Sequence, residues 1–227
     1  MSRVRNTVIQ WVGAIAYDYS AETQKVTLSL YDYDDSFNGG PAGSAAIGPV
    51  TGPTSGPRDW LYAIENAKTG SGADLLMGSS ADNTLDGGTG NDTLHGKAGN
   101  DRLLGGGGTD VFVFGGTVLS SFGASLTVAE MGRDTIVGFG ADDEIHLDRR
   151  TFTAFTFDAV GAINTAIFSA GNSLSRQMGA DDYFFYDSRT GNLFYDQDTK
   201  GGTAYAAVAF AVIDPIFGIT ASDLALV

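Results

Sequence analysis

Cysteine is absent from the 227 residues, and histidine occurs only twice. Without cysteine the chain can form neither a disulfide nor a thiolate zinc site. His95 and His146 form no HExxH motif and are too few for a catalytic zinc triad, so they are interpreted as strand or surface residues. No G-x-S-x-G sequence marks a nucleophilic serine. We therefore predict that the chain is not an enzyme, although its many aspartates leave a carboxylate-pair hydrolase open.

Positive charge is scarce, because 13 Lys and Arg residues stand against 27 acidic residues, for a formal net charge of −14. Nucleic acid and anionic membrane are unfavourable partners for such a charge. Glutamate is rare too: only four of the acidic residues are Glu, and the other 23 are Asp. The short aspartate side chain favours turns and sites for hard cations.

Long apolar segments are missing as well. The longest run, Ala204 to Ile213, has ten residues and is too short to cross a bilayer as a helix. The segment from Met1 to Ser20 has two arginines but no sustained apolar region, so we predict no N-terminal signal peptide.

Glycine, in contrast, is abundant with 32 residues, and many of them fall in a nine-residue repeat. Five rows follow one another without an insertion: Thr69–Met77, Gly78–Asp86, Gly87–His95, Gly96–Leu104 and Gly105–Val113. Position six of the rows holds Asp74, Asn83, Asp92, Asp101 and Asp110, and position eight holds Leu76, Leu85, Leu94, Leu103 and Phe112. A flexible linker would not keep an apolar residue in phase, so the pattern predicts a regular repeat structure.

The spacing of each row suits a six-residue turn followed by a three-residue strand, so that two rows complete one coil of a solenoid. Position eight then points inward, and rows n and n+2 stack about 4.8 Å apart. The glycines permit positive φ and leave carbonyl oxygens uncovered. Facing turns would present carbonyl oxygens and carboxylates, a set of hard donors that selects calcium. Since stacked aspartates repel one another, we expect calcium to be part of the fold.

These rows resemble the nonapeptide calcium repeat of the RTX (repeats-in-toxin, hemolysin-type) family, which forms a parallel β-roll. Rows three and five match G-G-x-G-x-D-x-U-x at every position. The other rows replace glycines with Thr69, Ser79, Ala81 and Lys97, and row two has Asn83, whose amide offers an oxygen without charge.

The resemblance extends upstream, where Asp59 to Gly78 is similar to the entry of the roll in serralysin-type secreted metalloproteases. In that family the glutamate of an I-E-N-A segment is a calcium ligand, which implies the same role for Glu65. Stacked turns would pair residues eighteen apart, such as Asp74 with Asp92. The resemblance implies about three to five calcium ions, held by residues of this set: Glu65, Gly70, Gly72, Asp74, Asn83, Gly87, Gly88, Gly90, Asp92, Gly99, Asp101, Gly105, Gly106, Gly108, Asp110, Asp134 and Asp143.

Downstream, the segment from Gly132 to Phe152 is similar to the strand pair that follows the repeats in this family, with Asp134 and Asp143 at its D-x-I positions. The segment from Phe184 to Ile213 resembles the closing hairpin, with its turn at Thr190 to Asn192. The ending ITASDLALV resembles C-terminal signals for type I, ABC-driven secretion. The resemblance thus implies a protein secreted from a Gram-negative bacterium, or held at its cell surface.

We predict an all-β fold: a parallel β-roll, or two-sheet solenoid, flanked by N-terminal capping strands and a C-terminal antiparallel β cap. The expected division is capping strands over residues 1–58 with a Gly/Pro-rich loop at 34–57, the roll over 59–116, and the C-terminal cap with its secretion signal over 117–227. We expect these parts to form one continuous domain.

Two functions remain open. One is a non-catalytic secreted module that folds on calcium binding and has a structural, adhesive or partner-binding role. The other is the C-terminal export and folding domain of a larger secreted enzyme, such as a serralysin-like metalloprotease. For the first, aromatic residues of the early strands favour either a cap of the roll or a surface for a cell-envelope, polysaccharide or protein partner.

Overall fold

The computed structural model describes two classes of residue. Residues 66–116, 127–153, 163, 167–172, 182–197 and 207–227 are described with their side chains. For the segments 7–11, 14–18, 27–29, 44–46, 60–62, 64–65 and 161–162 the backbone alone is described. The predicted 34–57 loop therefore lies outside the described residues except for a short strand, and so do the Glu65 side chain and the early aromatic side chains.

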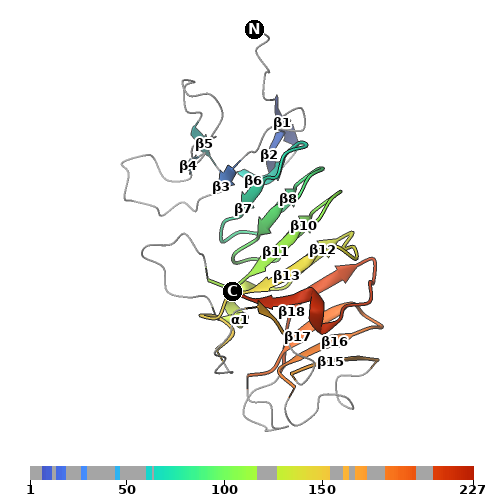
Figure 1. Cartoon of the computed structure of the whole chain (residues 1–227). Coiled ribbons are helices and arrows are strands. Elements are labelled where there is room, and N and C mark those ends of the chain that lie inside the picture. Colours follow the sequence, from blue (N-terminus) through green and yellow to red (C-terminus); the bar gives the residue numbers. More distant parts are fainter. Residues whose placement is uncertain are drawn as a thin grey trace.

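The described strands form two large sheets and one small pair (Figure 1). The first sheet has the order β1 (Thr7–Trp11), β2 (Ala14–Asp18), β6 (Ile64–Lys68), β8 (Thr84–Asp86), β10 (Arg102–Leu104), β12 (Asp134–Val137), β18 (Val208–Asp214), β17 (Asn192–Tyr195), β16 (Phe184–Asp187) and β15 (Phe168–Gly171). The second has the order β14 (Gly161–Ala162), β19 (Leu224–Leu226), β13 (Glu144–Leu147), β11 (Val111–Phe114), β9 (Thr93–His95), β7 (Leu75–Met77) and β3 (Thr27–Ser29). The small pair is β4 (Ser44–Ala46) with β5 (Trp60–Tyr62), which run antiparallel.

The repeat rows stack as the spacing predicts. Row n pairs with row n+2 in parallel register, so that Leu76 lies opposite Leu94 in one sheet and Leu85 lies opposite Leu103 in the other. Consecutive rows therefore alternate between the two sheets. This arrangement confirms the predicted parallel β-roll.

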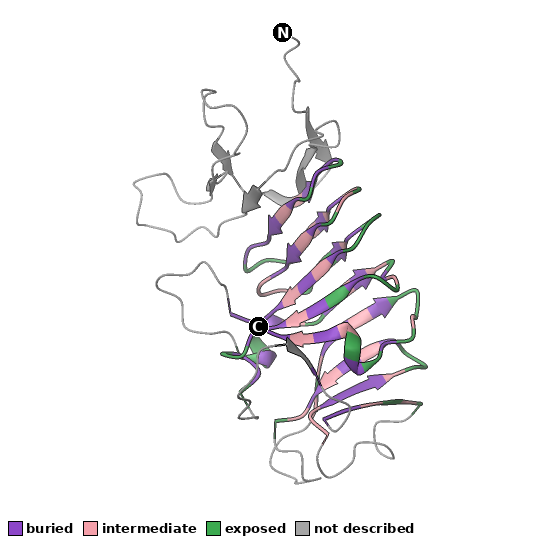
Figure 2. Cartoon of the chain, in the orientation of Figure 1, coloured by how far each residue is buried: buried purple, intermediate pink, exposed green. Residues whose placement is uncertain are grey.

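The core of the roll is a double ladder of position-eight side chains. Leu76, Leu94 and Phe112 from one sheet face Leu85 and Leu103 from the other, and all five are 0% exposed. Figure 2 shows the buried residues in the strands and the exposed residues mainly in the turns and loops between them. Each of these short strands thus contributes a fully buried position-eight side chain, and burial of a Leu or Phe side chain contributes about 1.5–3 kcal/mol.

Parallel stacking continues beyond residue 116. Ile136 of β12 pairs with Leu103, and Ile145 of β13 pairs with Phe112. The next parallel partners are Ile213 of β18 and Leu224 of β19. The two ladders are thereby extended by side chains that are at most 1% exposed.

Among the described strands, antiparallel pairs occur in the C-terminal part and among the strands that precede the roll. β16 and β17 form the predicted closing hairpin, whose turn ends at Gly191 with φ +73°. β17 also runs antiparallel to β18, and β14 runs antiparallel to β19. β1 and β2 form an antiparallel pair, and β2 joins β6 in parallel at the start of the roll.

An aromatic cluster fills the C-terminal end of the core. Phe152 packs edge-on against Tyr195 and Phe210, with ring centroids 5.1 and 5.3 Å apart. Phe114 at the end of β11 packs edge-on against Phe210 at 5.2 Å. Edge-to-face rings at this spacing add stability beyond their buried area. The cluster therefore fixes the antiparallel strands to the last rows of the roll.

Helix is rare in the described part of the chain. The one α-helix there, α1 (Val128–Met131), begins with a capping box in which Thr127 and Glu130 exchange hydrogen bonds. A short 3-10 helix at Ala221–Asp223 leads into β19. None of the described helices is long and apolar enough to cross a membrane.

Candidate metal centre

The position-six aspartates form two columns along the edges of the roll. In the odd rows, Asp92 Oδ1 accepts a hydrogen bond from the Asp74 backbone N–H at 2.8 Å. Asp110 Oδ1 accepts from Asp92 N–H at 2.9 Å, and Asp143 Oδ1 accepts from Asp110 N–H at 2.9 Å. Each carboxylate thus holds the backbone of the row before it in the same column.

The even rows repeat this pattern. Asp101 Oδ1 accepts from the Asn83 N–H at 2.7 Å, and Asp134 Oδ1 accepts from the Asp101 N–H at 3.0 Å. The structure therefore places Asp134 and Asp143, which come after the five rows, in the same two columns as the repeat aspartates.

The second oxygen of the inner aspartates is buried and has no hydrogen-bond partner. This applies to Oδ2 of Asp92, Asp101 and Asp110, and the three residues are only 1–2% exposed. A buried polar atom without a partner costs about 1–3 kcal/mol, and a charged one costs more. These oxygens are therefore positioned for a ligand that supplies positive charge.

Burial also raises the pKa values of these carboxyl groups. Loss of solvation is the largest cause for each, and it raises the pKa of Asp92 and Asp101 to about 7. The pKa of Asp134 rises to about 8, with the neighbouring Asp101 as the next cause, and that of Asp110 is raised as well. The carboxyl groups of the two columns are therefore harder to ionise unless a cation lies beside them.

The position-one glycines line the space next to these oxygens. A Cβ atom on Gly87 would lie 2.4 Å from Asp92 Oδ2 and 2.8 Å from the Gly105 carbonyl oxygen. Calcium binds oxygens at about 2.3–2.6 Å. The turn therefore leaves a cradle in which a carboxylate and a carbonyl oxygen converge on one point, and this donor set fits calcium.

Glycine is also required where the turns stack directly. A Cβ atom on Gly90 would lie 1.9 Å from the Gly72 carbonyl oxygen, and one on Gly108 would lie 1.9 Å from that of Gly90. Both glycines have φ in the left-handed region, at +126° and +131°. Lys97 is the one described non-glycine residue with positive φ, at 75°. At both Gly90 and Gly108 a carbonyl oxygen of one turn therefore lies directly against the glycine Cα of the turn two rows later.

Other predicted site residues lie in the same turns. Gly88, Gly99 and Gly106 have positive φ and stack on the turn two rows earlier, on Gly70, Ala81 and Gly88 respectively. Glu65 lies on β6, which pairs with β8, but its side chain lies outside the described residues. Asp143 differs from the inner aspartates, because its Oδ2 accepts a hydrogen bond from Gly140 N–H at 2.8 Å.

Gly132 is a member of the turn column that the sequence prediction missed. A Cβ atom there would lie 2.0 Å from the Gly99 carbonyl oxygen, and its φ is +81°. The next residue, Arg133, donates its N–H to Asn100 Oδ1 at 3.1 Å. The G-x-D spacing of Gly132 and Asp134, which repeats that of Gly99 and Asp101, was the available signal.

The two histidines lie in strands, as predicted, but differ in burial. His95 is 5% exposed, and its Nε2 lies 2.9 Å from the Gly115 carbonyl oxygen; this burial lowers its pKa to about 4. His146 is paired with Glu144 at 2.9 Å. Within the described ranges, no three His, Asp or Glu side chains cluster so as to hold a metal ion by themselves.

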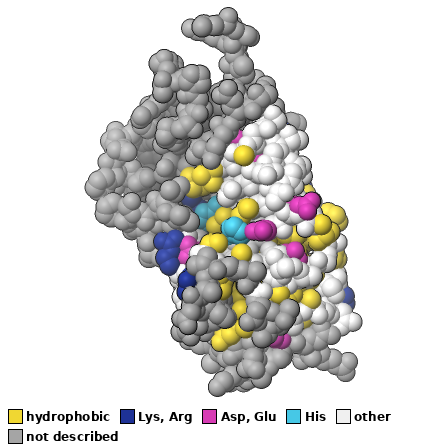
Figure 3. Space-filling model, viewed as in Figure 1, with side chains coloured by type: hydrophobic (Ala, Val, Ile, Leu, Met, Phe, Trp, Pro, Cys, Tyr) yellow, Lys and Arg dark blue, Asp and Glu magenta, His cyan; other side chains and the backbone are white. Residues whose placement is uncertain are grey.

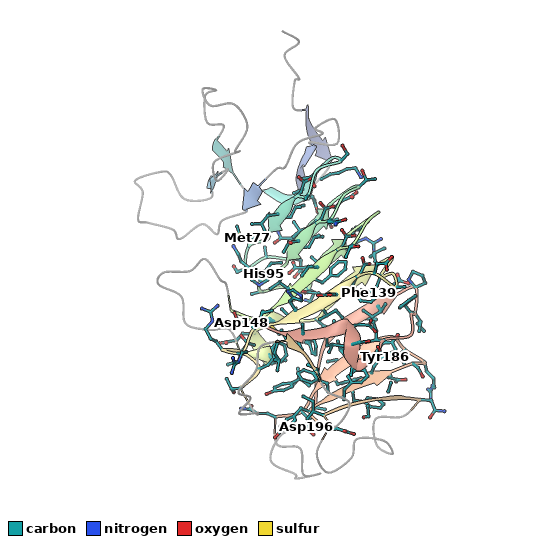
Figure 4. All side chains as sticks on the ribbon, viewed as in Figure 1. Met77, His95, Phe139, Asp148, Tyr186 and Asp196 are labelled. Carbon is teal, nitrogen blue, oxygen red and sulfur yellow. The ribbon has the colours of Figure 1, made fainter. Side chains whose placement is uncertain are left out.

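The face of the repeats that is seen in Figure 3 carries little charge. Figure 3 shows mainly backbone and uncharged polar atoms there, with isolated acidic side chains. In Figure 4, Met77 and His95 lie on neighbouring strands of the roll, while Asp148 lies lower, near the C-terminal strands. The aspartate carboxylates of the columns are thus largely enclosed by the turns and do not form an acidic outer surface.

Comparison with known families agrees with this geometry. The RTX calcium-binding nonapeptide repeat matches residues 68–103 and 86–116, with four copies. No curated protein matches the chain. The matched residues include the inner aspartates of both columns and the strands from β7 to β11.

Proposed function

We propose that this chain, which carries RTX calcium-binding nonapeptide repeats, is a secreted, non-catalytic module that folds on binding calcium outside the cell. Repeats of this family bind calcium and are generally structural elements. Its role would be structural, adhesive or partner-binding, because the proposed ion sites are closed in by their own turns.

The observation that carries this proposal is the set of buried carboxylate oxygens without partners. Asp92, Asp101 and Asp110 each present such an oxygen next to a position-one glycine. A hydrogen-bond donor or a cation must offset their burial. Calcium would supply that charge, with turn carbonyl oxygens completing the donor set.

We assign the inner ion sites to the carboxylates of Asp92, Asp101 and Asp110 and to carbonyl oxygens of the surrounding glycines. Asp134 and Asp143 would close the even and odd columns, because each accepts the backbone N–H of the preceding aspartate. In this proposal the protein's own groups hold the turns in register, and calcium neutralises the stacked carboxylates.

Calcium would then make folding depend on whether the chain is inside or outside the cell. At low cytosolic calcium the carboxylates repel one another and the roll stays unfolded, in a state suitable for type I export. Extracellular modules bind calcium at about 10⁻⁴ to 10⁻³ M, so millimolar calcium outside the cell would drive folding. RTX repeats are typical of secreted bacterial proteins, which supports this part of the proposal.

Chelation tests the proposal directly. Removing calcium with EGTA should abolish the β-sheet circular dichroism signal, and calcium should restore it with a midpoint in the millimolar range or below. Asp92→Asn should shift the midpoint to higher calcium, whereas Asp142→Asn, which removes the same charge at an exposed turn residue, should not. A β-sheet signal unaffected by EGTA, with no calcium bound, would contradict the proposal.

The alternative function is an export and folding domain of a larger secreted enzyme. The observation that favours it is the entry segment, since β6 carries the serralysin-like residues and stacks in parallel on β8. An HExxH motif in the same reading frame upstream would establish this alternative. A cell-envelope, polysaccharide or protein partner belongs to the first function, and loss of envelope binding after deletion of residues 36–56, with calcium-dependent folding retained, would support it.

A further inference from the structure

The first repeat row differs from the other four at position one. Rows two to five have glycine there, and row one has Thr69. A Cβ atom on Gly87, Gly96 or Gly105 would lie 2.4, 2.1 or 2.3 Å from Oδ2 of the aspartate in its own row. A side chain therefore cannot occupy this space in the inner rows while the carboxylate keeps its position.

Thr69 places a side chain in that space. The residue is 0% exposed, and its hydroxyl donates a hydrogen bond to the Gly87 carbonyl oxygen at 2.8 Å. Two rows further on, the corresponding carbonyl is that of Gly105, which faces the open cradle beside Asp92 Oδ2. The hydroxyl of Thr69 thus engages, between rows one and three, the carbonyl oxygen whose counterpart between rows three and five faces the cradle.

The first row of the even column differs in another way, because Gly78 keeps position one open but the side chain beside it is the amide of Asn83. Asn83 Oδ1 accepts a hydrogen bond from the Ser79 N–H at 2.7 Å and lies 3.2 Å from the Ser79 hydroxyl. The same hydroxyl accepts from the Ala81 N–H at 3.2 Å. Both Ser79 and Asn83 are buried, at 6% and 3% exposure. The oxygen of this turn is thus engaged by protein donors, and its amide carries no charge.

We propose that the Thr69 side chain fills the first gap of the odd column, and that Asn83, whose oxygen is engaged by Ser79, gives the first gap of the even column no charged ligand, so that calcium binding begins at row three. This inference rests on the proposed calcium-binding function and deepens it. Asp74 and Asn83, with Gly70 and Gly72, then shape the first turns without holding ions. The first turns of the roll are then held in place by the protein's own hydrogen bonds, and only the inner rows depend on calcium.

The test is the number of calcium ions bound per chain, measured by native mass spectrometry and by equilibrium dialysis with radioactive calcium. Thr69→Gly opens the first gap and should add one bound ion. Thr69→Val keeps the gap filled without the hydroxyl and should add none. The double variant Ser79→Gly/Asn83→Asp restores the repeat pattern in row two and should also add one ion.

Asp74 provides the complementary measurement. Asp74→Asn should leave the ion count of the wild-type chain unchanged, but it should remove the extra ion when combined with Thr69→Gly. Loss of an ion from Asp74→Asn alone, or an unchanged number of bound ions in folded Thr69→Gly, would overturn the inference that the first gaps hold no calcium. Either result would leave the proposed calcium-binding function standing. A wild-type chain that binds no calcium would overturn both. Should Thr69→Gly fail to fold, Asp74→Asn in the wild-type chain decides alone.

Discussion

Asp134 lies beneath Asp101 in the even column and accepts its backbone N–H at 3.0 Å, although 33 residues separate the two. Within the repeats the same hydrogen bond joins residues 18 apart, as between Asn83 and Asp101. Asp110 and Asp143 repeat the longer separation in the odd column. Both columns of aspartates therefore continue in register after the same interruption of the repeats.

Replacement of Asp134 should separate its two roles. Asp134→Ala leaves the buried N–H of Asp101 without an acceptor and should lower the free energy of unfolding by about 1–3 kcal/mol. Asp134→Asn keeps an oxygen acceptor but removes the charge, so it should weaken calcium binding with a smaller loss of stability. Urea unfolding in saturating calcium, together with calcium titration, measures both effects. Equal unfolding free energies for the two variants would contradict this assignment.

The turn stacking predicts a sharp difference between neighbouring glycines. Gly108→Ala places a methyl group 1.9 Å from the Gly90 carbonyl oxygen at φ +131°, and should cost about 2 kcal/mol or more. Gly107 lies in the same turn, but its nearest contact would be Thr89 Cγ2 at 3.8 Å. Gly107→Ala should therefore leave the thermal unfolding midpoint nearly unchanged. Similar losses for both variants would show that the close approach does not decide stability.

Lys97 should be replaceable by glycine with a gain in stability. Its backbone has φ 75°, a conformation that costs a side-chain-bearing residue roughly 1 kcal/mol relative to glycine. Lys97→Gly should raise the thermal unfolding midpoint in saturating calcium, whereas Lys97→Ala, which keeps a Cβ atom, should not. A lower midpoint for Lys97→Gly would mean that contacts of the lysine side chain outweigh the backbone strain.

His95 should make stability depend on pH. Burial is the main cause that lowers its pKa from 6.5 to about 4, and Lys97 adds to the effect. Folding therefore opposes protonation of His95. This residue should not affect the free energy of unfolding above pH 6.5, and it should lower that free energy as the pH decreases toward 4. The loss should reach roughly 3 kcal/mol.

Because carboxylates titrate in the same range, this effect must be measured as a difference. His95→Gln keeps a hydrogen-bond donor for the Gly115 carbonyl oxygen but does not titrate. Its unfolding free energy in saturating calcium should fall less steeply between pH 6.5 and 4 than that of the wild type. Parallel slopes for the two proteins would assign the acid sensitivity to other groups.

The repeats could be predicted because their signal is local and periodic. The phase of Leu85 and Leu103 in the nine-residue rows was sufficient to place both in the core, and it also set the pairing of alternate rows. Asp134 and Asp143 could not be placed by counting rows, since the interruption before α1 breaks the nine-residue period, and they were predicted through resemblance. The G-x-D spacing at Gly132 carried the same information and was overlooked.

The later coils could not be derived from periodicity. β18 is an apolar strand of seven residues, and its sequence does not show that its parallel partner is β12. Likewise, the sequence marks Thr69 only as a departure from glycine. Its burial and its hydrogen bond to Gly87 depend on a turn two rows away, which is a tertiary relationship.

The interruption between Gly116 and Thr127 has a practical consequence for protein engineering. Because β12 and β13 rejoin the stack in the register of β10 and β11, phase is maintained by lateral contact between coils and not by uninterrupted chain. A peptide epitope or a small reporter domain inserted in this part of the sequence is therefore expected to leave the register of the stack unchanged. Such a graft would be displayed on a scaffold whose assembly is switched by adding or chelating a metal ion.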